Sequence, residues 1–348
     1  EAPLIVFGAF DRHNLGDILL GHMAAREAAP RKVVFAGLAG RDLRVYGGMR
    51  VVPLRALARA WPRRYRGAPA DVLVAGGELI TTTAWEAAIM LEPPELANAL
   101  CGAFGANAAS RAAWARERLG VAAGLPYLPE RAPFGVGGVW QARALGGVRL
   151  AELDGGLQRE AAQSLGAFDG VSVRDRATQA ALAALGVSAR LEADPVTRLL
   201  EHFGARIAGR RRHGPAALLA RACPRGYVAV QFAAQYGDDA NIARIAANAA
   251  AAARQAGVRD VVFFRAGLAP WHDDVAPYRH CAQCVEGLAV QIFDAADVWD
   301  ICALIAGSRA CCTTSLHVTI VARGCGLPVL LLDGGTDAKL AAWADAWG

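Results

Sequence analysis

The chain has 348 residues and a net charge of +5, with 54% hydrophobic and 20% charged residues. This composition excludes a disordered chain, and the length predicts two domains because it exceeds what one hydrophobic core usually organises. No apolar run approaches the roughly 18–20 residues that a membrane-spanning helix needs, and no basic run with interleaved aromatic residues indicates nucleic-acid binding.

Short β-branched runs alternate with helical patterns in the first half of the chain. We expect strands at residues 4–7, 32–36, 71–75 and 171–173, and helices at 17–28, 84–103, 156–166 and 175–185. Strands separated by helices predict a mostly parallel sheet that is covered on both faces. We assign residues 1–203 to an N-terminal Rossmann-like domain.

A stretch rich in glycine, arginine and proline follows at residues 204–225. Its hydrophobic periodicity is weak, which predicts a linker between the two domains. The arginine run 210–212 within it predicts an exposed loop, with peripheral contact to anionic lipid headgroups as a weaker alternative.

The alternation resumes in residues 226–348, which we assign to a C-terminal Rossmann-like domain. We expect strands at 227–232, 260–265, 289–293, 309–312 and 328–332, and helices at 238–256, 297–306, 316–325 and 336–347. The last of these helices could pack back on the first domain. The sequence therefore predicts an α/β fold with two mostly parallel sheets facing a cleft, and ligands beyond the carboxyl ends of the strands.

Polar and glycine residues follow two of the predicted N-terminal strands. After the first strand, Asn14 and Asp17 could cap the next helix or reach into the cleft, and Gly16 permits a backbone path that a side chain would obstruct. The carboxylate of Asp17 could also orient or deprotonate a hydroxyl group. After a later strand, Gly76 and Gly77 allow main-chain amides to approach a ligand.

Two arginines stand at the carboxyl ends of predicted strands. Arg174 could hold a carboxylate or a phosphate in two-point contact, or it could form a structural salt bridge with Asp175 or Asp194. Asp194 closes the next strand and should face the same cleft. Arg265 and the polar segment 271–274 are expected to line the cleft from the C-terminal domain.

The most informative segment ends a strand of the C-terminal domain and begins the following helix. Thr314 or Ser315 can cap this helix, and its free amides and dipole favour a bound anion near Leu316. His317 lies in the first helical turn, where the positive helix end favours a neutral imidazole that can donate or accept a proton. We therefore predict a catalytic role for His317 and substrate binding by its three predecessors.

The order of these motifs resembles that of the polysaccharide pyruvyl transferase family over nearly the whole chain. The resemblance rests on Asn14-x-Gly16-Asp17, Gly76-Gly77, Ser172-Val173-Arg174-Asp175, Asp194-Pro195, Ser315-Leu316-His317 and Gly326-Leu327-Pro328. It implies a GT-B-like fold and the transfer of an enolpyruvyl group from phosphoenolpyruvate to two hydroxyl groups of a sugar, as a cyclic ketal. It also implies that Arg174 holds the phosphate or carboxylate of the donor and that His317 acts as acid or base.

The sequence departs from the family pattern at Ser315, where the family usually has an arginine. The departure removes one positive charge from the expected donor site, and Arg265 or Arg323 could replace it. Otherwise the donor differs or the usual activity is lost. Two alternatives therefore stay open: a GT-B glycosyltransferase that uses a nucleotide sugar, and a non-catalytic glycan-binding relative.

The expected partners are phosphoenolpyruvate as donor and a sugar, a lipid-linked sugar or a glycan as acceptor, without nucleic acid. We expect no cofactor and no metal, because the pair Cys281 and Cys284 lacks a second pair at zinc spacing. Other cysteines lie within apolar patterns and indicate a reducing cytoplasm. A position at the inner face of the membrane is a further option.

Overall fold

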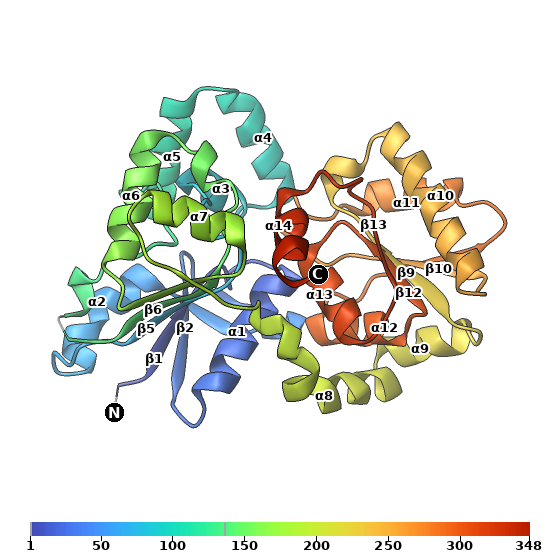
Figure 1. Cartoon of the computed structure of the whole chain (residues 1–348), viewed down its shortest axis with the longest axis horizontal. Coiled ribbons are helices and arrows are strands. Elements are labelled where there is room, and N and C mark those ends of the chain that lie inside the picture. The colour runs from blue at the N-terminus through green and yellow to red at the C-terminus, as the bar shows by residue number, and fades with distance from the viewer. Residues whose placement is uncertain (1, 136) are drawn as a thin grey trace.

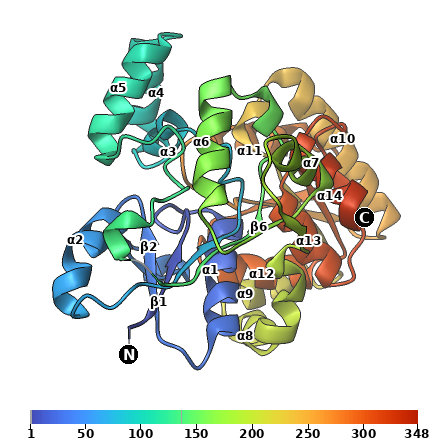
Figure 2. The ribbon, with the colours of Figure 1, turned by 60° about the vertical axis from the view of Figure 1, so that its left-hand side comes forward.

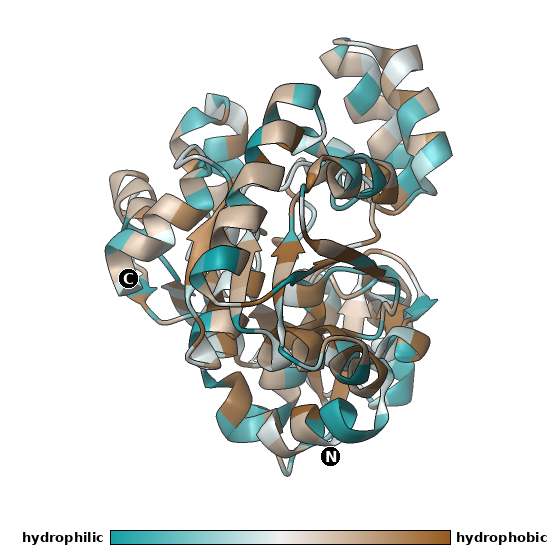
Figure 3. Cartoon of the chain, turned by 90° about the vertical axis from the view of Figure 1, so that its right-hand side faces the viewer, coloured by the Kyte–Doolittle hydropathy of each residue, from teal (hydrophilic) through white to brown (hydrophobic). Residues whose placement is uncertain are grey.

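The computed structural model describes residues 2–135 and 137–348, which form two α/β domains that lie side by side (Figure 1). Residues 1 and 136, both within the expected N-terminal domain, are outside the described part. Each domain is built around one sheet with helices packed against it. The strands are mainly brown in the hydropathy view and most teal segments lie at the periphery, so the apolar strands form the core (Figure 3).

The N-terminal sheet has eight strands in the order β3-β4-β2-β1-β5-β6-β7-β8, and all neighbours are parallel except β3 and β4. The strands are β1 (Leu4–Phe7), β2 (Val33–Gly37), β3 (Arg41–Asp42), β4 (Arg50–Pro53), β5 (Val72–Ala75), β6 (Trp140–Leu145), β7 (Gly170–Val173) and β8 (Arg190–Leu191). The helices are α1 (Leu15–Ala28), α2 (Leu54–Arg64), α3 (Ala84–Ile89), α4 (Pro94–Phe104), α5 (Ala108–Leu119), α6 (Gly155–Gly166) and α7 (Arg176–Ala184).

The C-terminal sheet has five parallel strands in the order β11-β10-β9-β12-β13. The strands are β9 (Tyr227–Gln231), β10 (Asp260–Phe264), β11 (Ala289–Phe293), β12 (Ala310–Thr313) and β13 (Val329–Leu331). The helices are α8 (Leu199–His213), α9 (Pro215–Ala222), α10 (Asp239–Gln255), α11 (Val275–Cys284), α12 (Val298–Gly307), α13 (Leu316–Gly324) and α14 (Ala338–Trp347). Within the described ranges, none of the helices combines the length and the hydropathy that crossing a bilayer requires.

Both sheets reverse their strand order beside a central strand. In the first sheet the chain leaves β1 toward β2 on one side and later returns to β5 on the other. In the second sheet β9 is flanked in the same way by β10 and β12. Connections that diverge like this leave a crevice outside the carboxyl ends of the strands, which is the usual place of a ligand site in doubly wound sheets.

Helix α1 carries the contact between the domains. It packs against α8, α12 and α13, and its apolar side chains belong to one buried cluster with those of the C-terminal helices. The indole of Trp299 on α12 donates to the carbonyl of Gly47 at 3.0 Å. Helix α14, drawn in red in Figure 1, returns to α7 of the N-terminal domain, where Trp347 donates to the carbonyl of Arg174 at 2.7 Å.

The segment 204–225, expected to be a linker, is largely helical. Helices α8 and α9 occupy most of it and pack against α12 of the C-terminal domain. The apolar residues of α8 recur every four positions at Leu199, Phe203 and Ile207, which keeps one helix face on the core despite two glycines. The arginine run 210–212 accordingly lies in the last turn of α8 and not in a loop.

The expected helix 84–103 is divided into two. A capping box of Thr83 and Glu86 starts α3, and the consecutive prolines Pro93 and Pro94 separate α3 from α4. Proline disfavours a helical conformation at the residue before it but is favourable in a first helical turn. Figure 2 shows α4 and α5 projecting away from the remainder of the N-terminal domain.

Candidate active site

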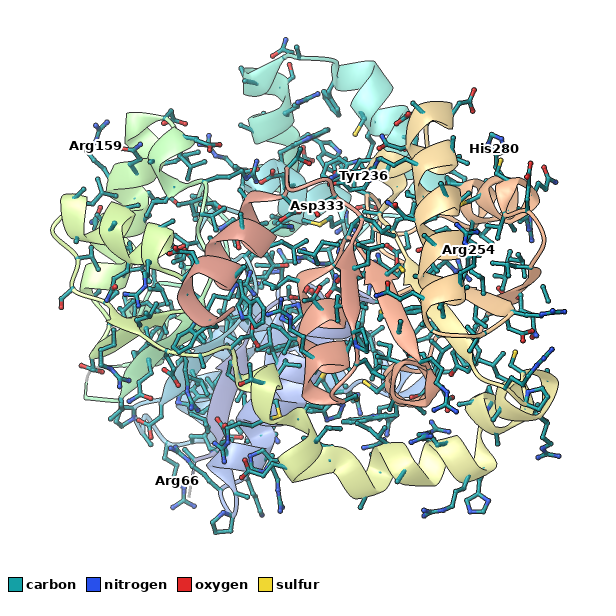
Figure 4. All side chains as sticks on the ribbon, turned by 45° about the vertical axis from the view of Figure 1, so that its right-hand side comes forward. Arg66, Arg159, Tyr236, Arg254, His280 and Asp333 are labelled. Atoms are coloured by element: carbon teal, nitrogen blue, oxygen red, sulfur yellow. The ribbon has the colours of Figure 1, made fainter. Side chains whose placement is uncertain are left out.

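A cavity of about 390 Å³ lies between the two domains, at the crevice formed by the carboxyl ends of the strands. Most residues that the sequence singled out line it, namely Asn14, Asp17, Gly77, Arg174, Thr314, Ser315, Leu316 and His317, together with Trp271, His272 and Asp273 of the segment 271–274. Tyr236 is also part of the wall, and Figure 4 shows it in the central part of the molecule. Both domains therefore contribute to a single site.

His317 lies in the first turn of α13, where local hydrogen bonds set the start of the helix. The side chain of Ser315 caps the helix by accepting from the Val318 amide, and the Ser315 amide donates to Thr313 Oγ1 at 2.9 Å. The Nε2 atom of His317 lies 3.2 Å from Oδ2 of Asp194, as an ion-pair contact without hydrogen-bond alignment. The cavity therefore presents an imidazole beside a carboxylate.

Asp194 is fully buried next to this imidazole. The pKa of its carboxyl group is about 2, below the ordinary value of 3.8. Burial alone would raise the pKa, but His317, Arg174 and the Val196 amide together lower it by more. Asp194 is therefore a carboxylate at neutral pH and can hold the ring of His317 in position.

Arg174 is buried beside the cavity and is shared between two carboxylates. Its Nη2 lies 2.9 Å from Oε2 of Glu78, and its Nη1 lies 3.3 Å from Oδ2 of Asp194. The structural salt bridge that the sequence left open is therefore present. Asp175 takes no part in it, because its carboxylate caps α7 by accepting from the Thr178 amide. An anionic ligand at Arg174 would lie close to two carboxylates, Glu78 and Asp194, which already pair with the positive charge of its guanidinium.

Glycines allow the loop after β1 to approach the opposite side of the cavity. A Cβ atom at Gly16 would overlap the ring of His317, so α1 can start beside this ring only because residue 16 lacks a side chain. Gly77 has a φ of +79°, and a Cβ atom there would lie 2.8 Å from Oδ1 of Asp17. Gly76 does not belong to the cavity wall and faces an apolar side chain of α1 instead.

Asn14 lies in the loop after β1, directly before α1, and connects the two domains. Its side chain caps α1 by accepting from the Asp17 amide at 3.1 Å. Its backbone forms an antiparallel bridge with Gly267, and the amide of Leu15 donates to the carbonyl of Ala266 at 2.7 Å. The loop after β1 is therefore hydrogen-bonded to the loop after β10, which fixes both sides of the cavity relative to each other.

The two arginines that could replace the missing family arginine do not line the cavity. Arg265 follows β10 as expected, but the two residues after it form the wall in its place. Arg323 lies in the last turn of α13 with its guanidinium over the ring of Trp343. That position is ~9 Å along the helix axis from His317, at 1.5 Å per residue. The expected contact of Arg265 with a ligand therefore has no support in the geometry.

Arg12, Gln231 and Lys339 are among the wall residues that the sequence analysis did not single out. Arg12 belongs to the same polar loop as Asn14, so its place after β1 was a usable signal. Gln231 is a polar residue at the end of an otherwise apolar strand, which is a second such signal. Lys339 reaches the cavity only because α14 returns toward the N-terminal domain. No pattern in the neighbouring sequence predicts this position.

His272 and Asp273 contribute two titratable groups from the C-terminal domain. Nδ1 of His272 lies 3.1 Å from the carbonyl of Pro270, and burial, assisted by the charge of Arg12, lowers the pKa of this histidine to about 4. Burial raises the pKa of Asp273 to about 7, against the opposing effect of the N–H groups that donate to it. A neutral His272 that donates from Nδ1 can accept a hydrogen bond at Nε2.

No group of three or more His, Cys, Asp or Glu side chains with the geometry of a metal site occurs in the part of the chain that the structure describes. Cys281 and Cys284 lie on α11, one buried and the other exposed. Neither belongs to the wall of the cavity.

The sequence model of the polysaccharide pyruvyl transferase family matches residues 146–335. Arg174, Asp194 and His317 fall inside this range, whereas the loops after β1 and β5 precede it. A comparison with curated protein sequences finds no match.

Solved structures that resemble this chain include three UDP-N-acetylglucosamine 2-epimerases. The enzyme of Rickettsia bellii has a TM-score of 0.51 and 10% identity, over 99% of this chain and 86% of the epimerase. The enzyme of Neisseria meningitidis, solved with UDP-GlcNAc, has a TM-score of 0.51 and 11% identity over 97% and 85%. The enzyme of Methanocaldococcus jannaschii has a TM-score of 0.51 and 9% identity over 95% and 83%. At these identities the likeness shows the fold alone, which is two facing Rossmann-like domains of the GT-B type.

Proposed function

The chain belongs to the polysaccharide pyruvyl transferase family, and we propose that it transfers a pyruvyl group from phosphoenolpyruvate to two hydroxyl groups of a sugar or glycan, as a ketal. The observation that carries this proposal is the position of His317, at the amino end of α13, beside the buried Asp194 and in a cavity that both domains line. This arrangement combines a proton carrier with main-chain amides that attract an anion.

The donor is an anion, and the proposal assigns its carboxylate group to the amino end of α13 and to Arg174. Both line the same cavity. Thr314 Oγ1 accepts from the Ala233 amide at 3.0 Å, which leaves its hydroxyl hydrogen free to donate to a donor oxygen. Leu316 and Ser315 contribute the first turn of the helix, whose dipole favours negative charge.

In the proposed reaction, His317 acts beside Asp194 as the proton carrier of the cavity. It gives its proton to the methylene carbon of the donor while a sugar hydroxyl attacks the central carbon, and it then takes the proton of that hydroxyl. The bond from the central carbon to the phosphate oxygen breaks, and phosphate leaves. A second hydroxyl of the sugar attacks the same carbon and closes the ketal, and its proton leaves with the phosphate.

On the acceptor side, the proposal gives Asp17 the task of orienting the attacking hydroxyl. Its carboxylate lies in the cavity wall next to Gly77. His272 supplies a neutral hydrogen-bond acceptor on the other side. A free, a lipid-linked or a polymeric sugar is compatible with these groups. We also propose that the protein acts in a reducing cytoplasm, which agrees with its free cysteines.

The rival proposal is a glycosyltransferase that uses a nucleotide sugar, because two of the structural neighbours, the epimerases of Neisseria meningitidis and Methanocaldococcus jannaschii, were solved with UDP-GlcNAc. Thermal unfolding in the presence of phosphoenolpyruvate, and separately of UDP-GlcNAc, distinguishes the two. A ligand at 100 times its Kd stabilises a protein by about 2.7 kcal/mol, so the true donor raises Tm clearly. Stabilisation by UDP-GlcNAc alone would favour the rival.

The direct test is incubation with phosphoenolpyruvate and a panel of methyl pyranosides and lipid-linked sugars. The expected result is phosphate release coupled to a pyruvyl ketal on one class of acceptor, detected by mass spectrometry. Phosphate release that never depends on a sugar, or no release with any acceptor, would contradict the proposal and favour a glycan-binding protein without catalysis.

A further inference from the structure

Four cations line the cavity: Arg12, Arg149, Arg174 and Lys339. Three of them are paired with carboxylates or exposed to water. Arg174 is shared by two carboxylates, at 2.9 and 3.3 Å. Arg149 pairs with Glu86 at 3.1 Å, with 49% of its side chain exposed. Lys339 lies 4.0 Å from Asp337, with 46% exposed. The remaining cation, Arg12, is buried, has one carboxylate neighbour at 3.6 Å and has an Nε atom without a hydrogen-bond partner.

Arg12 is only 5% exposed, so its charge is removed from bulk water. Its Nη1 donates to the Tyr127 hydroxyl at 3.2 Å, and its guanidinium carbon lies 5.6 Å from the centre of that ring. Its carboxylate neighbour Asp17 lies 3.6 Å from Nη2, beyond hydrogen-bonding distance. Its Nε is buried without a hydrogen-bond partner. A buried guanidinium with five N–H donors is costly unless these donors are satisfied.

The Nε atom of Arg12, which has no hydrogen-bond partner, and its Nη2 atom, 3.6 Å from Asp17, lie on the same edge of the guanidinium. Nε and Nη2 point in parallel and form the edge that binds carboxylate or phosphate groups in two-point contact. Nη1, on the other side, is the atom that Tyr127 holds in place. The ring of Tyr127 therefore orients the fork without using its bidentate edge.

The acidic groups around this edge do not neutralise it fully. Asp17 is a loose partner at 3.6 Å. The second carboxyl group, Asp11, is directed away, because its Oδ2 accepts from the Ala39 amide at 2.7 Å. Burial also raises the pKa of Asp11, which disfavours its charged form. The guanidinium of Arg12 therefore has one carboxylate, that of Asp17, near its Nη2 atom, and its Nε atom has no hydrogen-bond partner.

We propose that Arg12 is the phosphate-binding residue of the cavity, taking the phosphate group of the substrate on its Nε and Nη2 edge. The assignment of that phosphate to the donor rests on the proposed function. Phosphate then competes with Asp17 for the guanidinium, and its departure during the reaction is assisted by a cation that has no second carboxylate. Arg174, with its two carboxylates, positions Asp194 and the neighbouring His317 and is left with the carboxylate group of the donor.

The test measures dissociation constants by calorimetry for inorganic phosphate, phosphoenolpyruvate, pyruvate and UDP, in the wild type and in two variants. Arg12→Gln removes the charge, and Arg12→Lys keeps the charge but removes the fork. For phosphate and phosphoenolpyruvate, Arg12→Gln should weaken binding about tenfold or more, with a smaller loss for Arg12→Lys. Pyruvate, which has no phosphate, should bind the variants and the wild type alike.

Arg131→Gln is a matched control. Arg131 also stands over an aromatic ring, at 5.6 Å from Trp140, pairs with Asp169 at 2.7 Å and has a buried Nε without a partner. It differs in that it does not line the cavity. Its replacement should leave all four dissociation constants unchanged, so any loss specific to Arg12 cannot come from removing a stacked arginine as such.

Two results would overturn the inference: a folded Arg12→Gln protein that binds phosphate as tightly as the wild type, or one that loses UDP but keeps phosphoenolpyruvate. If the variants unfold, a crystal of the wild type soaked in phosphate decides, because the anion should lie on Nε and Nη2 of Arg12 and not on Arg174. A failure of the proposed function can be distinguished from a failure of the phosphate site. Loss of phosphate binding in Arg12→Gln without any ketal formation by the wild type would support the phosphate site and reject the pyruvyl transfer.

Discussion

The two sides of the cavity are built in different ways. The N-terminal wall is formed by Arg12, Asp17, Glu78 and Arg174, and the C-terminal wall by Gln231, Trp271, Thr314, Ser315 and His317. In the N-terminal wall, charged side chains meet partners that are distant in the sequence, as Arg174 meets Glu78 across 96 positions. In the C-terminal wall, short-range hydrogen bonds around the start of α13 determine the geometry, such as the one from the Ser315 amide to Thr313. Long-range ion pairs therefore hold Arg174 in the N-terminal wall, whereas local hydrogen bonds set the start of α13 in the C-terminal wall.

This difference indicates a division of tasks. The C-terminal wall holds the proton carrier and the helix amides, whose positions change little as long as β12 and α13 are intact. The N-terminal wall holds charges whose balance depends on several segments at once. Substitutions at the start of α13 should therefore affect mainly the chemical step, and those of the charged side chains Arg12 and Arg174 mainly binding and stability.

The largest effect is expected when His317 is replaced by alanine. General acid–base catalysis is typically worth about 10²–10⁴-fold, so kcat for ketal formation should fall by that factor while KM for the donor changes little. His280→Ala is the control, because His280 is exposed at 49% and lies at the periphery in Figure 4. A folded His317→Ala protein with full activity would rule out the assigned role.

The next largest effect on kcat is expected where α1 of the N-terminal domain contacts His317 of the C-terminal domain, at Gly16. In Gly16→Ala the new methyl group would overlap the ring of His317, which must then move. Misplacement of a reacting group by about 1 Å can cost on the order of 10²-fold in rate, so kcat should drop strongly without loss of any functional side chain.

Gly209→Ala provides the matched comparison for this substitution. A Cβ atom at Gly209, within α8, meets nothing within 4 Å. Alanine should therefore stabilise that helix by about 0.5–1 kcal/mol and leave activity unchanged. Equal activities of the two alanine variants would show that the walls are not in contact at Gly16.

The third-largest effect is expected in the dependence of the unfolding free energy on pH when Asp194 is replaced. The pKa of Asp194 is about 2 in the folded chain against an ordinary 3.8, so the ionised carboxylate stabilises the fold above pH 3.8, and this stability is lost as the pH falls toward 2. The depression corresponds to about 2 kcal/mol. Asp194→Asn should flatten this part of the curve of unfolding free energy against pH and lower kcat, because His317 loses its partner.

A carboxylate that is exposed to water gives the baseline for this experiment. Asp239 is 96% exposed, and Asp239→Asn should leave the acid limb of the stability curve as in the wild type. A wild-type curve that is flat between pH 4 and pH 2, or an Asp194→Asn curve that keeps the same slope, would speak against a depressed pKa.

The smallest effect is expected at the opening of the cavity. Trp271 is 44% exposed, has a φ of +66° and lines the cavity, so its ring offers an apolar face to a sugar. Aromatic contacts of this kind contribute about 0.5–1.5 kcal/mol. Trp271→Ala should raise KM for the acceptor several-fold and leave the donor KM unchanged, whereas Trp271→Phe keeps most of the affinity. An unchanged acceptor KM in Trp271→Ala would remove this residue from the acceptor site.

Much of the architecture follows from local pattern. The buried runs at β1, β5 and β9 are mostly apolar and rich in β-branched or aromatic residues, so their length and flanking residues mark them as central strands. The start of α13 was also predictable, since Ser315 is a capping residue directly after a strand. His317 could be proposed for the same reason, because its place in the first helical turn depends only on neighbours in the sequence.

What the sequence by itself determined is thus the α/β alternation and the start of α13, where Ser315 is placed at the cap and His317 in the first helical turn by neighbours a few positions away. Only the tertiary structure decided that Arg174 is shared by two carboxylates, that Arg265 is outside the cavity wall, and that Arg12 belongs to it. The physical reason is that the charge available to a ligand depends on every ionised group within a few ångströms. Those groups come from strands and loops that only folding brings together.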